Sequence, residues 1–101
     1  MILLNTTFIV HKSIESQFIT WAKETYVPTA TDSNIFINPI FSRIMADSDP
    51  DGNGYAIQLR AQNLEQAITW HDTVAAKLKQ ELSKKWGEKI LHFTTYMQII
   101  H

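Results

Sequence analysis

Cysteine is absent from this sequence, and neither sign of charge is in clear excess. Without cysteine there is no disulfide framework and no thiolate chemistry. The formal net charge is -1, whereas proteins that bind a phosphate backbone usually carry a clear excess of lysine and arginine. No apolar run approaches a membrane span, and the apolar start at residues 1–4 is too short for a signal peptide. We therefore expect a cytoplasmic protein that binds neither nucleic acid nor membrane.

The sequence does contain enough apolar side chain for one core. Hydrophobic residues make up 45% of the chain and charged residues 19%, which is typical of a globular protein rather than a disordered one. A chain of 101 residues is long enough for one core and too short for two. We expect a single domain spanning residues 1–101.

Two hydrophobic periodicities alternate along the chain, one typical of strands and one of helices. The predicted strands span residues 2–10, 35–45, 55–60 and 91–99. The predicted helices span residues 14–28 and 64–86. Pro28 is expected to end the first helix, and Pro39 indicates an edge position or a bulge in the second strand. Asn63 and Gln66 resemble a capping box, and Gly87 suits the end of the second helix.

The order β-α-β-β-α-β is that of a ferredoxin-like α+β domain, in which both helices pack on one face of a four-stranded antiparallel sheet. Alternation assigns the strand residues to two faces, and a slip of one residue would reverse an assignment. The residues expected beneath the helices are Ile2, Leu4, Phe8, Tyr55, Ile57, Leu59, Leu91, Phe93 and Met97. Those expected on the opposite, open face are Leu3, Asn5, Thr7, Ile9, Gln58, Arg60, His92, Thr94 and Tyr96. The second strand adds to this face either Phe41 and Arg43 or Ile40 and Ser42.

The open face is predicted to be mixed in character. Leu3, Ile9 and Tyr96 make it too apolar for a solvated surface, while its amide and charged groups make it too polar for a sealed core. Such a face suits a sheet-to-sheet homodimer that encloses a ligand cavity, and the alternative is a monomer with scattered apolar residues. The candidate cavity residues are Asn5, Thr7, Arg43, Gln58, Arg60, His92 and Tyr96. The arginines would favour an anionic group on the ligand.

An acidic turn resembles the opening of an EF-hand calcium loop, D-x-D-x-D-G. Its residues are Asp47, Asp49, Asp51 and Gly52. The loop needs a bidentate glutamate at its twelfth position, where this sequence has Gln58, and flanking helices where this sequence predicts strands. A strand-to-strand turn is the better interpretation, and no metal site is expected.

Residues 53–60 faintly resemble the RNP1 octamer of RNA-recognition motifs. Gly54 and Tyr55 fit that pattern, but Ile57 and Arg60 stand where the central and final aromatic residues belong. Because RNA binding by this motif requires bases to stack on those rings, we do not expect an RNA ligand.

The titratable residues offer one candidate pair for acid–base chemistry. His92 and Tyr96 project from the same side of one strand, within reach of a shared ligand, although a dimer contact is the alternative. His71 lies within the apolar stripe of the second helix and is expected to be a hydrogen-bonded core histidine. The lysines expected to form a solvated surface are Lys77, Lys79, Lys84, Lys85 and Lys89.

Three segments carry a resemblance to a known family. They are residues 21–28 (WAKETYVP), residues 55–59 (YAIQL), and residues 86–89 (WGEK) followed by Phe93-Thr94-Thr95. These segments are similar to an uncharacterised bacterial family, domain of unknown function 4286, and the resemblance runs nearly end to end. That family usually has histidine at the position of Tyr26. The resemblance implies no chemistry, because the family has no established activity.

The wider group that the chain resembles is the dimeric α+β barrel superfamily, in which two ferredoxin-like sheets enclose a cavity. Some members are cofactor-poor monooxygenases, and one branch degrades haem with an asparagine, a tryptophan and an axial histidine. Asn5 and Trp70 match the first two positions, but Gln80 occupies the third, so the axial ligand is missing. The resemblance therefore implies no cofactor, and the fold alone does not determine a function.

Three functions remain open at this point. The preferred one is a small homodimeric α+β-barrel protein that binds an anionic or aromatic small molecule between its two sheets. The alternatives are a cofactor-poor monooxygenase- or isomerase-like enzyme that uses the same cavity, and a dimerisation module without a ligand. The sequence favours binding over catalysis without deciding between them.

Overall fold

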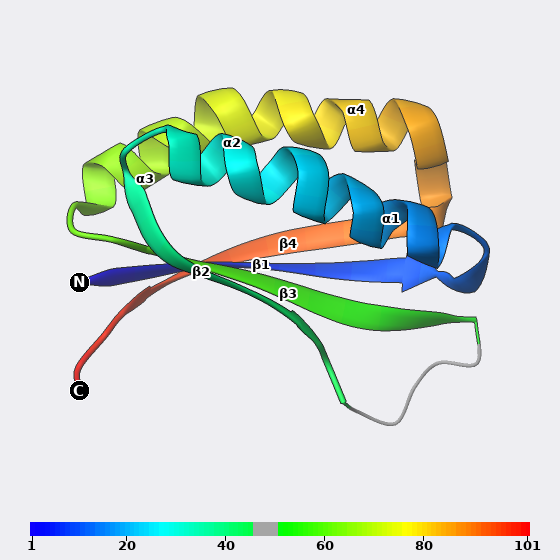
Figure 1. Ribbon diagram of the computed structural model, residues 1–101, viewed down its shortest axis with the longest axis horizontal. Helices are drawn as coiled ribbons and strands as arrows, with labels where there is room; N and C mark the ends of the chain where they lie inside the picture. The colour runs from blue at the N-terminus through cyan, green and yellow to red at the C-terminus, as the bar shows by residue number, and fades with distance from the viewer. Residues whose placement is uncertain (46–50) are drawn as a thin grey trace.

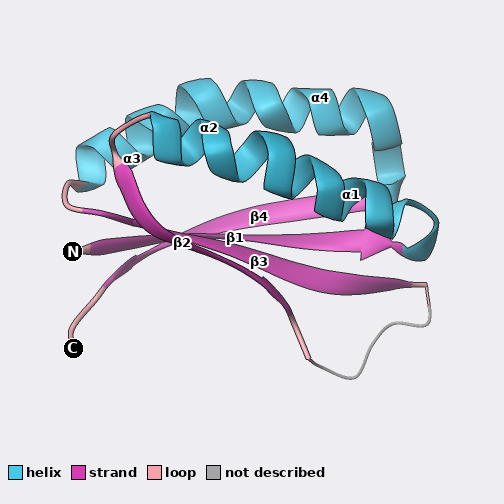
Figure 2. Cartoon of the chain, in the orientation of Figure 1, coloured by secondary structure: helices cyan, strands magenta, loops and turns pink. Residues whose placement is uncertain are grey.

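The computed structural model describes residues 1–45 and 51–101, which form two layers. Figure 1 shows the helices packed on one face of the sheet and the other face bare, and Figure 2 separates the two layers by colour. The strands are β1 (Ile2–His11), β2 (Phe36–Arg43), β3 (Gly52–Ala61) and β4 (Ile90–Gln98). Their order is β2-β3-β1-β4, and every neighbouring pair is antiparallel. The predicted ferredoxin-like α+β fold is confirmed.

The first helical segment continues past Pro28, contrary to the prediction. It consists of η1 (Lys12–Ile14), α1 (Glu15–Trp21), η2 (Ala22–Tyr26) and α2 (Val27–Asp32). The segment η2 is a π-helical turn in which the Val27 amide donates to the Ala22 carbonyl. A proline inside a regular helix clashes with the carbonyl four residues before it and removes a donor. Here the widened turn precedes Pro28, so the helix passes the proline at the start of α2.

The second helical segment begins at residue 64 and its α-helical part ends at residue 86, as the sequence predicts, but a short 3-10 turn follows. Its parts are α3 (Leu64–Trp70), η3 (His71–Ala75), α4 (Ala76–Trp86) and η4 (Gly87–Lys89). The Asn63 side chain accepts a hydrogen bond from the Gln66 amide at 3.1 Å, which caps the helix. Gly87 adopts a φ of 55°, a left-handed conformation that an L side chain rarely adopts, and it ends α4. The segment η3 is a second π-helical turn.

The strand β2 is an edge strand with a bulge, as Pro39 predicts. Its register against β3 shifts between Ile37 and Ile40, and Asn38 has a φ of 51°. A proline cannot donate to the ladder, so it is tolerated at an edge or a bulge. Beyond the bulge, Ile40 pairs with Gln58, which places Ile40 and Ser42 on the open face. Of the two assignments left open for β2, the structure has the second.

The predicted face assignment is confirmed for β1 and β3 and is wrong for β4. Phe8 pairs with His92 and Thr6 with Thr94 across the β1–β4 ladder, and directly opposite residues share a face. The helix face of β4 therefore carries polar residues: His92, Thr94 and Tyr96. Its open face carries the apolar residues Leu91, Phe93 and Met97, with Thr95 between them.

The core lies between the sheet and the helices. Phe8 is completely buried and contacts the rings of Phe18, Trp21 and Tyr26. A buried aromatic side chain contributes several kcal/mol to stability. Strand β4 enters this core through Ile90, which is 5% exposed. Once Ile90 is buried, alternation directs the even-numbered residues of β4 towards the helices.

The acidic turn connects strands and not helices, as the sequence predicts. Asp47 and Asp49 lie outside the described residues, while Gly52 begins β3 and Gln58 belongs to the middle of that strand. Within residues 1–45 and 51–101, no helix is long and apolar enough to cross a membrane.

Candidate functional site

A polar cluster interrupts the apolar packing on the helix face of the sheet. Thr6 of β1 is 1% exposed and lies directly opposite Thr94 of β4. Their Oγ1 atoms are 3.0 Å apart, which makes a hydrogen bond between the two strands. Buried hydroxyls require such partners, because an unpaired one costs about 1–3 kcal/mol. The two threonines therefore place a satisfied polar centre beneath the second helical segment.

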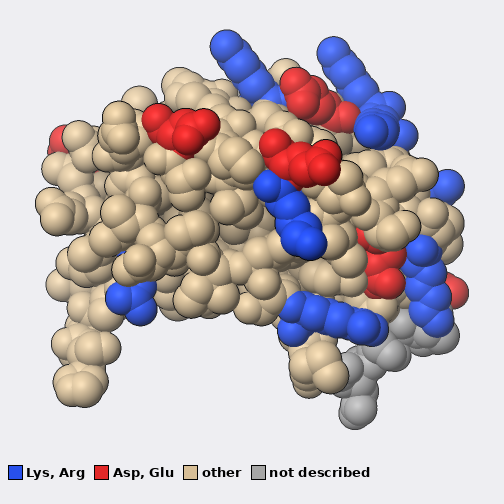
Figure 3. Space-filling model, viewed as in Figure 1, with Lys and Arg blue, Asp and Glu red and all other residues tan. Residues whose placement is uncertain are grey.

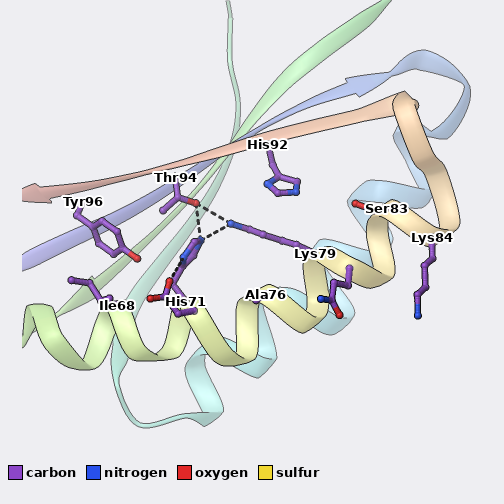
Figure 4. A pocket seen from close by; sticks show the side chains of 11 residues that line it. Ile68, His71, Ala76, Lys79, Ser83, Lys84, His92, Thr94 and Tyr96 are labelled. Carbon is purple, nitrogen blue, oxygen red and sulfur yellow. Dashed lines mark hydrogen bonds and ion pairs between the residues drawn. The ribbon is translucent and has the colours of Figure 1, made fainter.

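Two side chains from that segment complete the cluster. The Lys79 Nζ atom donates to Thr94 Oγ1 at 2.9 Å and lies 2.6 Å from His71 Nε2. His71 Nε2 also lies 3.0 Å from Thr94 Oγ1, so the three groups form a triangle. Figure 4 shows Lys79 reaching across from α4 towards the strand and His71 rising from η3.

The π-helical turn explains why His71 and Lys79 meet. Two regular turns of an α-helix take about 7.2 residues, and a π turn adds roughly one residue. A spacing of eight residues across η3 therefore returns to the same side of the helix. Without the extra residue, Lys79 would be rotated away from His71 and Thr94.

The hydrogen bonds assign the protons of the triangle. A lysine ammonium has only donors, so His71 Nε2 is the acceptor in its contact with Lys79. The His71 proton then lies on Nδ1, which faces Asp72 Oδ1 at 3.5 Å. Asp72 is exposed and partly neutralises the positive end of the cluster.

Burial changes the acid–base properties of these groups. Burial lowers the pKa of Lys79 to about 8. Burial first, and then the nearby charge of Lys79, lowers the pKa of His71 and of His92. Burial raises the pKa of Tyr96, and the Asp72 carboxylate adds to that rise. Near neutral pH the site thus combines neutral imidazoles with an amine that releases its proton readily.

The cluster forms part of the wall of an open groove between α3–η3–α4 and β4. The groove has a volume of about 1130 Å³, large enough for a small-molecule ligand. Figure 4 shows Tyr96 and Ile68 together, with His92 and Ser83 farther along the groove. The lining residues are Ile68, His71, Asp72, Ala76, Lys79, Gln80, Ser83, Lys84, His92, Thr94 and Tyr96.

The structure divides the predicted cavity residues between two places. Asn5, Thr7, Gln58 and Arg60 share the open face, where Asn5 pairs with Gln58 and donates from Nδ2 to Thr7 Oγ1 at 3.3 Å. Their proposed role in ligand binding stays a prediction.

His92 and Tyr96 lie on the other side of the sheet, in the groove, so the expectation that they face a partner sheet is wrong. Arg43 belongs to the edge strand β2 and pairs with Tyr55, a helix-face residue of β3, so it is also separated from the open face. The cause in β4 is a shift of one residue in the expected alternation, which moves every side chain to the other face.

The expectation of a solvated side chain is wrong for Lys79. It is 8% exposed, whereas we expected all five lysines near α4 to be solvated. His71 is hydrogen-bonded, as predicted, but it also lines the groove. Two features of the sequence point towards a buried Lys79. Thr6 interrupts the apolar face of β1, and Lys79 follows His71 by eight residues.

The haem-binding arrangement of the wider superfamily is not reproduced here. Asn5 lies on the open face, while Trp70 is buried beneath the helices against Tyr26 and Phe36. Only Gln80 belongs to the groove. These residues do not fit haem. Among the described residues there is also no group of three or more His, Asp or Glu side chains that could hold a metal ion.

Two buried polar atoms near the cluster have no hydrogen-bond partner among the described residues. They are Tyr26 Oη and Trp70 Nε1, whose rings meet edge to face at 6.0 Å. Burial raises the pKa of Tyr26 to about 12, so its hydroxyl stays protonated at any physiological pH.

The open face carries a large exposed apolar surface, which we call the open-face patch. Its most exposed members on β4 are Leu91 (63%) and Phe93 (57%). Its residues are Ile9, Ile37, Ile40, Ile44, Leu91, Phe93 and Met97. Monomeric proteins rarely leave so many large apolar side chains together in water. By contrast, Figure 3 shows basic and acidic side chains interspersed over the visible side of the helices.

Comparison with solved structures shows what the chain is similar to. A proposed antibiotic biosynthesis monooxygenase from Deinococcus radiodurans superposes with a TM-score of 0.74 at 11% identity, over 100% of this chain and 94% of that one. HapK from Hahella chejuensis gives 0.72 at 12% identity, over 99% and 93%. A dimeric ferredoxin-like protein from an uncultured marine organism gives 0.68 at 10% identity, over 99% and 95%. Such low identities show a shared fold alone.

Among protein families and curated proteins, one family matches the chain. No curated protein matches the chain. The profile of one family, described as a domain of unknown function (DUF4286), matches residues 1–100. This match identifies the chain as a member of the DUF4286 family, and its structural neighbours show that it has the fold of dimeric α+β barrel proteins.

Proposed function

We propose that the groove between β4 and the second helical segment binds a small molecule with an anionic group and an apolar body. The observation that carries this proposal is the buried amine of Lys79 on the groove wall. A buried cation is costly unless it is paired, and its two hydrogen-bond partners, His71 and Thr94, are neutral. An anionic ligand would supply the missing charge.

The rest of the groove supports this class of ligand. Lys84 adds a second positive charge to the lining, and among the described residues that line the groove Asp72 is the only carboxylate. Ile68, Ala76 and the Tyr96 ring offer an apolar surface to the body of the ligand. His92 also lines the groove, on the far side of the Lys79 amine from Tyr96 (Figure 4), where it can donate or accept one hydrogen bond. An aromatic carboxylate has the matching distribution of charge and apolar surface.

Proton-transfer catalysis in the same groove is the second candidate. The 2.6 Å contact between Lys79 and His71 favours it, because the two nitrogens can exchange one proton. His92 and Tyr96 would deliver or accept protons at the substrate, as an isomerase- or monooxygenase-like reaction requires. A structural neighbour bears a monooxygenase description, but at 11% identity it supports the fold and not the reaction.

Binding can be tested with benzoate and its neutral analogue benzamide. Titrations followed by nitrogen–proton NMR should shift the amides around His71 and Thr94, with benzoate binding at least about tenfold more tightly, or about 1.4 kcal/mol. Lys79→Met should abolish this preference, and Lys77→Met, on the same helix but exposed, should retain it. Equal binding of the two compounds, or shifts confined to the open face, would contradict the proposal.

We also propose that two copies of the chain associate through the open-face patch. The patch lies on the face of the sheet that no helix covers (Figure 1). A two-fold axis would bring two identical patches together, and isologous pairing is the commonest arrangement of homodimers. A structural neighbour with 10% identity is itself described as dimeric. Light scattering that finds only monomers across micromolar concentrations would overturn this part of the proposal.

A further inference from the structure

Lys79 combines three properties that are not found together in the exposed lysines Lys77 and Lys84. Its Nζ atom is held by His71 and Thr94, its side chain is 8% exposed, and it lines a groove of about 1130 Å³. Lys77 and Lys84, on the same helix, are exposed. A buried, oriented amine beside a proton acceptor is the arrangement that carbonyl-capturing lysines use.

We propose that Lys79 is a nucleophile that captures carbonyl compounds in the groove as a protonated imine. The inference rests on the groove being the ligand site proposed above. It adds a covalent step and a substrate class: an aldehyde or ketone that also carries an anionic group.

The step balances without any outside oxidant or reductant. The Lys79 ammonium transfers one proton to His71 Nε2, which already lies 2.6 Å away. The free amine pair forms a bond to the carbonyl carbon, and the carbonyl π pair moves to its oxygen. That oxygen takes up the proton held by His71 and one proton released by the Lys79 nitrogen, and it leaves as water when the C–N double bond forms. The sum is one ammonium and one carbonyl giving one protonated imine and one water.

The surrounding groups can carry the protons that this sequence needs. His71 receives the first proton; burial lowers the pKa of this imidazole, and the Asp72 carboxylate, 3.5 Å from its Nδ1, partly offsets that effect. His92 and Tyr96, on the same face of β4, line the groove where the leaving oxygen would lie. The pKa of Lys79, lowered to about 8 by burial, leaves a larger fraction of free amine near neutral pH than an exposed lysine has.

The probe is 4-carboxybenzaldehyde with sodium cyanoborohydride, which reduces an imine to a stable secondary amine. Peptide mapping of the labelled wild-type protein should show Lys79 modified at least tenfold faster than Lys77 or Lys84. Lys79→Met should lose this fast phase and Lys77→Met should keep it. Mapping of the wild type keeps the test valid if the Lys79 variant fails to fold. Labelling spread over all lysines according to their exposure would overturn the inference.

Two further measurements separate this inference from the binding proposal. If benzoate binds in the groove but 4-carboxybenzaldehyde labels Lys79 no faster than Lys77, the covalent step is overturned and the binding site is retained. Benzaldehyde that labels Lys79 as fast as its carboxylated analogue would support the nucleophile and remove the anionic preference. Added benzoate should slow the labelling of Lys79 at least fivefold and leave that of Lys77 unchanged.

Discussion

Each of the two faces of the sheet carries a group of side chains that a simple domain would place on the other face. The helix face, buried beneath the helices, contains the cluster of Thr6, His71, Lys79 and Thr94. The open face, which no helix covers, contains the open-face patch. Polar groups within a core and apolar groups on a surface both carry a free-energy cost in an isolated chain. Each is explained if the first face binds a ligand and the second binds another copy.

Phe8 and Phe93 allow the two faces to be compared with one residue type. Phe8→Ala removes a fully buried ring, so it should lower the free energy of unfolding by about 3–5 kcal/mol at every protein concentration. Phe93→Ala should change the stability of the monomer by no more than about 0.5 kcal/mol. Its effect should emerge only at concentrations where the wild type associates. Urea unfolding at several protein concentrations measures both, and equal effects at low concentration would contradict the assignment of the faces.

A charge placed in the open-face patch should prevent association. Phe93→Asp buries a carboxylate in each half of the proposed interface, and loss of a central contact typically costs about 2 kcal/mol or more. The dissociation constant should therefore rise at least about thirtyfold. Ser16→Asp adds the same charge to the exposed side of α1 and should leave association unchanged. Sedimentation or light scattering across a concentration series provides the measurement, and an unchanged dimer in Phe93→Asp would exclude this interface.

Thr94 and Thr95 allow the same comparison for a hydroxyl. Thr94→Val keeps the shape of the side chain but removes the oxygen that contacts Thr6, His71 and Lys79, so it should destabilise the protein by about 1–3 kcal/mol. Thr95 is exposed on the open face, and Thr95→Val should change stability by less than about 0.5 kcal/mol. Thermal or urea unfolding of both variants measures the change in the free energy of unfolding that each substitution causes. If both lose the same stability, the triangle around Thr94 contributes nothing of its own.

The sequence predicts the architecture well because local patterns and global topology agree there. Alternation in β1 and β3, the Asn63 cap and the proline at the edge of β2 each follow from short-range physics. The face of β4 could not be predicted in the same way. In an isolated domain the apolar residues Leu91 and Phe93 would be expected beneath the helices. The pairing of Phe8 with His92 in the structure shows that the even-numbered residues of β4 face the helices and that Leu91 and Phe93 lie on the open face.

The site is predictable only in part, because it depends on contacts that pattern alone does not determine. Alternation predicts that His92 and Tyr96 project the same way from their strand, and both residues line the groove. The sequence does not indicate that Lys79 belongs to the site, because lysine in a charged helix is usually solvated. Its burial requires the π turn η3, and a π turn has no clear sequence signal. A polar residue such as Thr6 in a buried apolar stripe is the nearest available hint.

The pH dependence of stability gives the smallest expected effect and tests the helix face directly. Because burial lowers the pKa of Lys79 to about 8, the unfolded chain binds more protons than the folded one between pH 8 and the ordinary lysine range. Stability due to this group must therefore rise as the pH increases through that window. Between pH 8 and 9.5 the wild type should gain about 1 kcal/mol relative to Lys79→Met.

The upper limit of pH 9.5 matters because three tyrosines titrate in the opposite sense. Burial raises the pKa of Tyr26, Tyr55 and Tyr96, so above the ordinary tyrosine range the unfolded chain loses protons that the folded chain retains. Their contribution to stability falls there in wild type and variant alike, and it cancels in the difference between them. Urea unfolding at pH 7, 8, 9 and 9.5 measures that difference. A difference that stays constant with pH would mean that the Lys79 amine is solvated, and the groove would then lose the group on which both proposals for it depend.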